Sequence, residues 1–236
     1  MNLGCVTDKG NYRQKNQDRI FCNKKCVEGH SLGIACVCDG IGSMPFSEVA
    51  SEMMIEGIAD WLDGVVKYYP EIMNTEAMVE DLEITIRELN DLICEHKESK
   101  QIEIGCTMSL ICVTDCEYFI FHVGDSRIYS VEDKLVQLTQ DEIVVRQVNG
   151  REKSYLMNYI GKNKQLRLYR TKGNVTAGAV YVIGSDGLYK KMRYEDVMQL
   201  FRISSDEEAE RISGKLIALM LARGEKDNIS CAVLKV

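Results

Sequence analysis

Hydrophobic and polar residues follow two different periods along the chain, which predicts a protein of mixed α and β structure. Apolar residues recur at helical spacing from Ser47 to about Val65 and again from Asn74 to about His96. This spacing predicts two amphipathic helices that pack together. Short apolar runs bounded by glycine or polar residues predict strands. We expect strands at 33–38, 107–113, 118–123, 127–131, 166–169, 179–183 and 229–236, and further helices at 194–201 and 207–223.

The order of these elements favours an α+β fold. Strands and paired helices come in blocks rather than in strict alternation, which is typical of helices that cover antiparallel sheets. We interpret the runs between 107 and 131 as an antiparallel meander. Residues 140–160 are mixed and polar, and we interpret them as a helical segment of a mobile flap. No break in composition divides the chain, so we predict a single domain over residues 1–236.

Composition narrows the function classes. A formal charge of −7 disfavours nucleic acid as a partner. No apolar run reaches the roughly 20 residues of a membrane span, and the N-terminus has no basic segment followed by an apolar one. We therefore predict a cytoplasmic protein that binds neither membrane nor nucleic acid. The 10 cysteines, several inside strand-like runs, are interpreted as reduced thiols rather than as disulfides or zinc ligands.

Five aspartates stand beside predicted strands and are flanked by glycine, asparagine or serine: Asp18, Asp39, Asp125, Asp186 and Asp227. Taken singly, each has a simple explanation, because aspartate in such sequences commonly hydrogen-bonds a turn backbone. Several carboxylates at sheet ends, however, would form an oxygen-rich site of the kind that Mg²⁺ or Mn²⁺ prefers. The three histidines are too scattered along the chain to form an imidazole site.

The motifs around these aspartates occur in a recognisable order. They are Gly10-Asn11-Tyr12-Arg13-Gln14-Lys15-Asn16-Gln17-Asp18, Val37-Cys38-Asp39-Gly40-Ile41-Gly42, Gly105-Cys106-Thr107, Val123-Gly124-Asp125-Ser126-Arg127, Leu138-Thr139-Gln140-Asp141, Ile183-Gly184-Ser185-Asp186-Gly187-Leu188 and Lys226-Asp227-Asn228. In this order they resemble the metal-dependent protein serine/threonine phosphatases of type 2C, particularly the small bacterial members. The resemblance covers essentially the whole chain.

The resemblance implies a four-layer α-β-β-α sandwich with two Mn²⁺ or Mg²⁺ ions, and possibly a third, held at one end. Its motifs assign these roles by position: Asp39 bridges both metals, the Gly40 carbonyl binds one of them, Asp186 and Asp227 complete the other, Asp18 acts through a bound water, Asp125 holds a third ion, and Arg13 binds the substrate phosphate. The implied reaction is hydrolysis of phosphoserine and phosphothreonine in proteins. A cognate serine/threonine kinase and a monomeric state are further expectations.

Two departures from the family pattern affect the outer part of the site. Gly42-Ser43-Met44 stands where relatives commonly have Gly-Gly-His, so the histidine often proposed as general acid is missing. Gln17 replaces the acid that usually precedes the first aspartate. Two alternative functions remain open: a phosphoprotein-binding pseudophosphatase that has little or no activity, and a metal-dependent phosphatase of small phosphomonoesters. The first is disfavoured because the metal-binding acids are retained.

Overall fold

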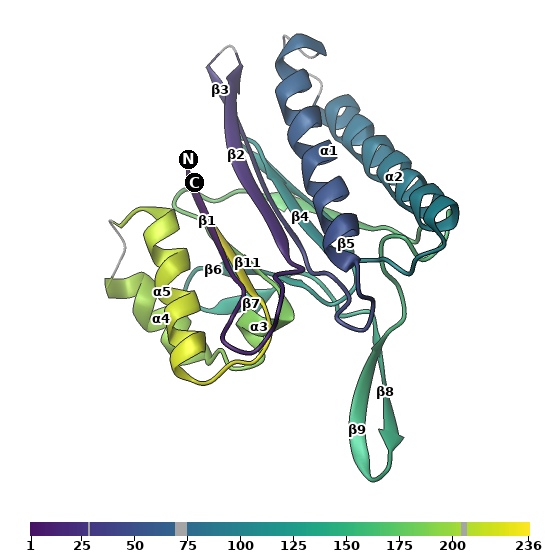
Figure 1. Cartoon of the computed structure of the whole chain (residues 1–236). Coiled ribbons are helices and arrows are strands. Elements are labelled where there is room, and N and C mark those ends of the chain that lie inside the picture. The colour runs from purple at the N-terminus through teal and green to yellow at the C-terminus, as the bar shows by residue number, and fades with distance from the viewer. Residues whose placement is uncertain (28, 69–74, 204–206) are drawn as a thin grey trace.

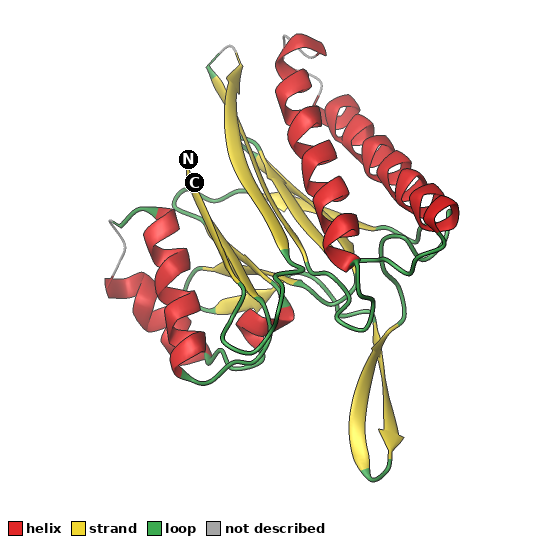
Figure 2. Ribbon diagram, in the orientation of Figure 1, coloured by secondary structure: helices red, strands yellow, loops and turns green. Residues whose placement is uncertain are grey.

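The computed structural model describes residues 1–27, 29–68, 75–203 and 207–236, and these residues form four layers (Figures 1 and 2). Helices α1 (Ser47–Tyr68) and α2 (Thr75–Lys100) cover one side, and α4 (Tyr194–Ile203) and α5 (Ala209–Ala222) cover the other. Two antiparallel sheets lie face to face between the helix pairs. The predicted α-β-β-α sandwich is confirmed.

Each sheet has five strands. In order across the first sheet they are β1 (Asn2–Asp8), β12 (Ile229–Lys235), β11 (Val180–Gly184), β6 (Arg127–Val131) and β7 (Leu135–Gln137). In order across the second they are β10 (Tyr169–Asn174), β5 (Glu117–Val123), β4 (Met108–Val113), β3 (His30–Cys38) and β2 (Arg19–Val27).

The central strands are apolar on both faces because each face meets another layer. On β4, Leu110 packs toward α1 and α2, while its neighbour Ile111 packs between the sheets. The same alternation holds on β12, where Val233 faces α5 and Leu234 faces the other sheet. A strand buried on both faces appears in the sequence as an unbroken apolar run, which is why these strands were predictable.

The predicted meander is wrong in its last strand. β4 and β5 pair as expected, but β6 lies in the opposite sheet, beside β11. The chain crosses between the sheets at Gly124, whose φ is 103° and whose added Cβ would come within 2.7 Å of Thr107. Only glycine adopts this backbone readily. The crossover therefore sets Asp125 at the junction of the two sheets.

The interpretation of residues 140–160 as helical is also wrong. They form a projecting hairpin of β8 (Ile143–Val148) and β9 (Arg151–Leu156), at the bottom of Figure 1. Its two turn residues, Asn149 and Gly150, both have positive φ, at 51° and 74°. Asn-Gly is the strongest short hairpin signal, because both residues tolerate the left-handed backbone of a type I′ turn. That dipeptide is the local signal from which the hairpin could have been predicted.

Other predicted element boundaries also differ from those of the structure. β10 begins where the strand predicted at 166–169 was expected to end. Strands β1, β2 and β7 and the single-turn helix α3 (Asp186–Tyr189) were not predicted, because their polar and apolar residues follow no clear period. The predicted start of the second helix at Asn74 lies outside the described residues.

Candidate active site

Strand register brings the sequence-distant aspartates to one end of the sandwich. Asp18 precedes β2, whose first residue pairs with the last residue of β3, immediately before Asp39. Asp186 follows β11 and Asp227 precedes β12, and those two strand ends pair with each other as well. Antiparallel pairing always places the end of one strand beside the start of the next. Strand pairing therefore places Asp18 near Asp39 and Asp186 near Asp227. The pairing of Arg127 with Gly184 in the first sheet likewise places Asp125 near Asp186.

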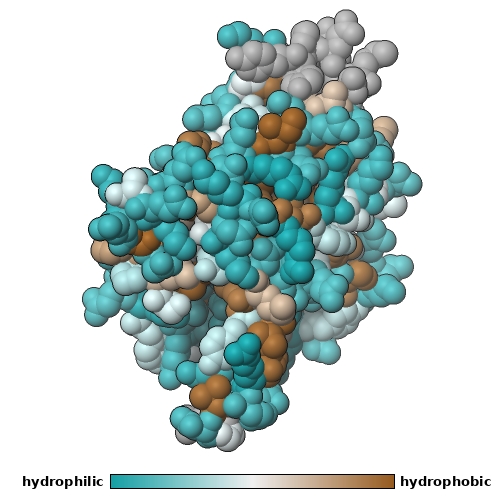
Figure 3. Space-filling model, turned by 90° about the vertical axis from the view of Figure 1, so that its right-hand side faces the viewer, coloured by the Kyte–Doolittle hydropathy of each residue, from teal (hydrophilic) through white to brown (hydrophobic). Residues whose placement is uncertain are grey.

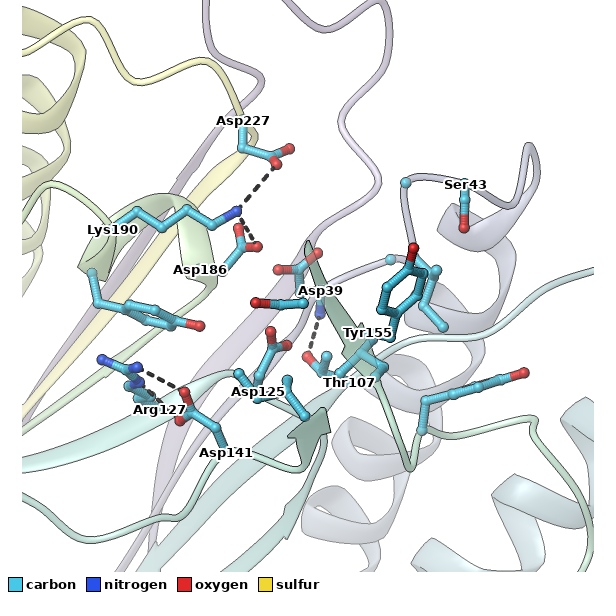
Figure 4. A pocket seen from close by; sticks show the side chains of 18 of the residues that line it. Asp39, Ser43, Thr107, Asp125, Arg127, Asp141, Tyr155, Asp186, Lys190 and Asp227 are labelled. Atoms are coloured by element: carbon cyan, nitrogen blue, oxygen red, sulfur yellow. Dashed lines mark hydrogen bonds and ion pairs between the residues drawn. The ribbon is translucent and has the colours of Figure 1, made fainter. Parts of the chain in front are cut away.

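A cavity of about 820 Å³ opens at this end of the molecule (Figure 4). Of the predicted site residues, Arg13, Asp39, Gly40, Asp125, Asp186 and Asp227 line it. Asp18 does not line the cavity: it is 1% exposed and accepts a hydrogen bond of 2.8 Å from the Ser230 hydroxyl. In Figure 4, the carboxylates of Asp39, Asp125 and Asp186 point toward a common centre.

The backbone of Asp39 is held from both sides by Thr107. The Asp39 amide donates to Thr107 Oγ1 at 3.1 Å, and the Thr107 amide donates to the Asp39 carbonyl at 2.8 Å. These two bonds fix the loop that follows β3 against the start of β4. The Asp39 carboxylate thus enters the cavity from a rigid backbone, as a ligand or a catalytic group requires.

The clustered carboxylates raise one another's pKa values. Burial, followed by the charges of Asp18, Asp186 and Asp125, raises the pKa of Asp39 well above its usual range. Burial also raises the pKa of Asp18 to about 6, against hydrogen bonds from Ser230 and Ser185 that lower it. For Asp125, burial and the Asp186 charge raise the pKa to about 6. Such mutually raised values indicate a concentration of negative charge that lacks enough positive charge.

Two cations meet the carboxylates on one side of the cavity. Arg13 Nε and Nη2 each donate to a different oxygen of Asp227 at 2.8 Å, a bidentate pair. Lys190 Nζ donates to Asp186 Oδ2 and lies 3.8 Å from Asp227 Oδ2 (Figure 4). Lys190 was not among the predicted site residues, although its spacing of four residues from Asp186 is that of a helical ion pair.

A second bidentate pair flanks the cavity. Arg127 donates to both oxygens of Asp141 at 2.9 and 2.7 Å, and its guanidinium stacks 3.6 Å from the centre of the Tyr189 ring. Arg127 and Asp141 belong to motifs that carry the family resemblance, but neither was among the predicted site residues. Because the pair ties β6 to the segment before β8, it supports the base of the hairpin at the cavity wall.

The donor chemistry fits a hard divalent cation. Among the described residues, no group of three histidine, cysteine, aspartate or glutamate side chains lies close enough together to coordinate one metal ion without side-chain movement. Lys190 and Arg13 hold two of the carboxylates instead. Carboxylate oxygens are nevertheless the ligands that Mg²⁺ and Mn²⁺ prefer, and the half-buried carboxylates of Asp39 and Asp125 form no ion pair with a lysine or arginine among the described residues.

Comparison with known proteins establishes the family. The sequence profile described as protein phosphatase 2C matches residues 11–220. The chain belongs to the protein phosphatase 2C family. As a member it is a serine/threonine protein phosphatase, which confirms the resemblance inferred from the motifs.

Relatives of this 2C phosphatase include bacterial enzymes. The serine/threonine phosphatase stp of Listeria monocytogenes serotype 4b is 27% identical over 250 residues, covering 97% of this chain and 93% of that protein. The serine/threonine protein phosphatase PstP of Mycobacterium tuberculosis is 24% identical over 245 residues, covering 98% of this chain and 44% of that protein.

Solved structures share the fold. The PstP catalytic domain, determined with two manganese ions, superposes with a TM-score of 0.78 at 22% identity, covering 98% of this chain and 96% of that one. Stp1 of Staphylococcus aureus superposes with a TM-score of 0.82 at 18% identity, covering 100% and 95%.

The cysteines of this 2C phosphatase form no disulfides, and its described helices are not membrane spans. All 10 cysteines are free thiols, as predicted. None of the helices in the described ranges combines the length and the apolar character needed to span a bilayer.

The raised carboxylate pKa values predict that the metal-free phosphatase is less stable at pH 8 than at pH 5. Asp125 and Asp18 titrate near 6 when folded, against an ordinary value of 3.8, so the stability that their protonated forms provide is lost as the pH rises through 6. We expect on the order of 1 kcal/mol per group over this interval, and a decrease in Tm of a few degrees.

Thermal unfolding of metal-stripped protein, followed by circular dichroism at both pH values, measures this difference. Asp125→Asn should shrink it by the share of one group, since Asp125 no longer titrates while the other carboxylates with raised pKa values still do. A metal-free Tm that is constant or higher at pH 8 would contradict the mutual repulsion inferred for the cavity.

Proposed function

We propose that this phosphatase hydrolyses phosphoserine and phosphothreonine in proteins at a binuclear Mn²⁺ or Mg²⁺ centre in the cavity. The observation that carries the proposal is the convergence of Asp39, Asp125 and Asp186 from three separate segments onto one point, with Asp227 beside them. When bound, the two ions would activate a bridging water and neutralise the phosphoryl oxygens, so that no protein nucleophile is needed.

The proposed ligand roles are those that the family motifs imply for each position. Asp39 has a fixed backbone and points into the centre, so it suits the bridging position. The carbonyl of Gly40 would bind one ion, and Asp186 with Asp227 would complete the other. A side chain at Gly40 would meet the Gln17 carbonyl at 2.6 Å, so glycine is required there. Asp125 would hold a third, weaker ion.

Asp18 is proposed to act on the metal ions without coordinating them directly. It is buried against Ser230 and next to Asp39, without facing the cavity, so a water molecule has to connect it to an ion. Its negative charge would help to retain the cations through the Asp39 carboxylate. The Ser230 hydrogen bond would hold the Asp18 carboxylate in place beside Asp39.

Arg13 is proposed to bind the substrate phosphate. Its side chain is 42% exposed and lines the cavity, and Gly42 leaves room for the guanidinium, which would lie 3.2 Å from an added Cβ. The bidentate fork that now binds Asp227 matches two phosphate oxygens equally well. Binding of a metal ion by Asp227 would free the fork for the substrate. With Met44 in place of the family histidine, the leaving-group proton has to come from another group.

The β8–β9 hairpin favours a polypeptide substrate over a small ester. Tyr155 and Leu156 line the cavity, while Val145, Tyr155 and Met157 are 52%, 43% and 50% exposed. Apolar surface is visible on the hairpin at the bottom of Figure 3, whereas most of the surface around it is hydrophilic. Exposed apolar side chains that gather next to a reaction site can serve as a contact surface for a peptide chain.

Metal-dependent phosphate release tests the proposal. Metal-stripped protein should be inactive, and Mn²⁺ should restore hydrolysis of both p-nitrophenyl phosphate and a phosphothreonine peptide. Protein that binds Mn²⁺ without turning over either substrate would support the pseudophosphatase alternative. Hydrolysis of p-nitrophenyl phosphate but not of any phosphopeptide would support a small phosphomonoester as substrate. A kinase partner, a monomeric state and a cytoplasmic location remain predictions.

A further inference from the structure

Lys190 connects two carboxylates that the proposed function assigns to a metal ion. It follows the single turn of α3, and its backbone amide donates to the Asp186 carbonyl at 3.0 Å. From there the side chain turns back, so that Nζ donates to Asp186 Oδ2 and lies 3.8 Å from Asp227 Oδ2 (Figure 4). One ammonium group therefore holds together carboxylates that are 41 residues apart in sequence.

The ammonium and a divalent ion would compete for the same carboxylate oxygens. Asp186 and Asp227 each have a limited number of oxygens facing the cavity, and Arg13 already uses both oxygens of Asp227. A cation coordinated by these carboxylates would lie within a few Å of Nζ, where two positive charges repel strongly. The Lys190 side chain is 48% exposed, so it can move into solvent without breaking the core.

We propose that Lys190 is a built-in cation that holds Asp186 and Asp227 together in the metal-free protein and is displaced when a divalent ion binds them. It is a positioning residue that stabilises the empty site and lowers its metal affinity. The inference rests on the proposed metal centre.

Mn²⁺ titration of metal-stripped protein by isothermal calorimetry tests the displacement. Lys190→Met should bind Mn²⁺ about tenfold more tightly than the wild type, because no ammonium has to leave. Lys190→Arg keeps the charge and should stay close to the wild type. Lys226→Met is the matched control: it removes the same charge beside Asp227, but the Lys226 ammonium faces the Tyr12 ring at 5.3 Å instead of a carboxylate. Its affinity should change much less.

Thermal unfolding provides a second measurement. A lysine with a merely structural role would raise Tm both with and without Mn²⁺, whereas the proposed role raises it only without metal. Without metal, Lys190→Met should unfold at a lower temperature than the wild type, because Asp186 and Asp227 lose their shared cation. With saturating Mn²⁺, its Tm should equal or exceed that of the wild type. A drop in both states, or Mn²⁺ affinity that is unchanged or weaker in Lys190→Met, would overturn the inference. Absence of Mn²⁺ binding in every variant would overturn it too.

Activity assays separate this inference from the proposed function. If the affinities follow the predicted pattern but no phosphoester is hydrolysed, the proposed function fails and the role of Lys190 stands. If Mn²⁺ supports hydrolysis but the affinity of Lys190→Met equals that of the wild type, the function stands and the role of Lys190 fails.

Discussion

Replacing Asp39 by asparagine is expected to lower Mn²⁺-dependent turnover roughly a thousandfold or more. Asp39 is the proposed bridging ligand, and an amide provides neither the negative charge nor the second anionic oxygen that two ions share. The initial rate of p-nitrophenyl phosphate hydrolysis at saturating Mn²⁺ measures the effect. The loss should not be recovered by raising the Mn²⁺ concentration, because the geometry of the pair is lost along with its affinity.

The fold of this variant should be intact. Because burial and neighbouring carboxylates raise the pKa of Asp39, removing its charge relieves repulsion, and metal-free Asp39→Asn should unfold at a temperature equal to or above that of the wild type. Asp115→Asn is a suitable control, since Asp115 is exposed and pairs with His30 away from the cavity. Retention of more than about a tenth of the wild-type turnover in Asp39→Asn would refute the bridging role.

Gly4→Ala is expected to destabilise the protein by about 3 kcal/mol or more and to lower Tm by roughly 6 to 12 °C. A Cβ at Gly4 would come within 1.9 Å of the Glu210 amide nitrogen and 2.6 Å of the Ala209 carbonyl carbon, so β1 and the start of α5 must separate. These are backbone atoms, which cannot rotate away as a flexible side chain would. Urea unfolding followed by fluorescence of the single tryptophan measures the change.

Gly214 provides the matched substitution within the same helix. No atom lies within 4 Å of a Cβ added there, and the residue lies inside α5. Gly214→Ala should therefore stabilise the protein by about 0.5 to 1 kcal/mol, through better helix propensity. If Gly4→Ala unfolded at the same urea concentration as the wild type, the close packing of β1 on α5 would be incorrect.

The turn of the β8–β9 hairpin can be predicted from its own residues, whereas its two strands cannot. Asn149-Gly150 specifies its turn by itself, since the dipeptide prefers the required backbone without any help from the rest of the chain. The flanking strands were not predicted, because in the described residues β8 and β9 pair only with each other and present no buried face, so their apolar residues follow no period that marks a strand. Strand β4 could be predicted because it is buried on both faces and therefore forms an unbroken apolar run.

The layers, the family and the set of acids could all be predicted without coordinates, because burial on both sheet faces and the glycine-flanked aspartates leave local patterns in the sequence. Which strands share a sheet and which charges meet depend instead on long-range packing. The crossover that sends β6 to the opposite sheet is set by contacts between layers. The contact of Lys190 with Asp227 and the ion pair of Arg13 with the same carboxylate join residues from distant segments, and spacing along a chain does not encode such contacts.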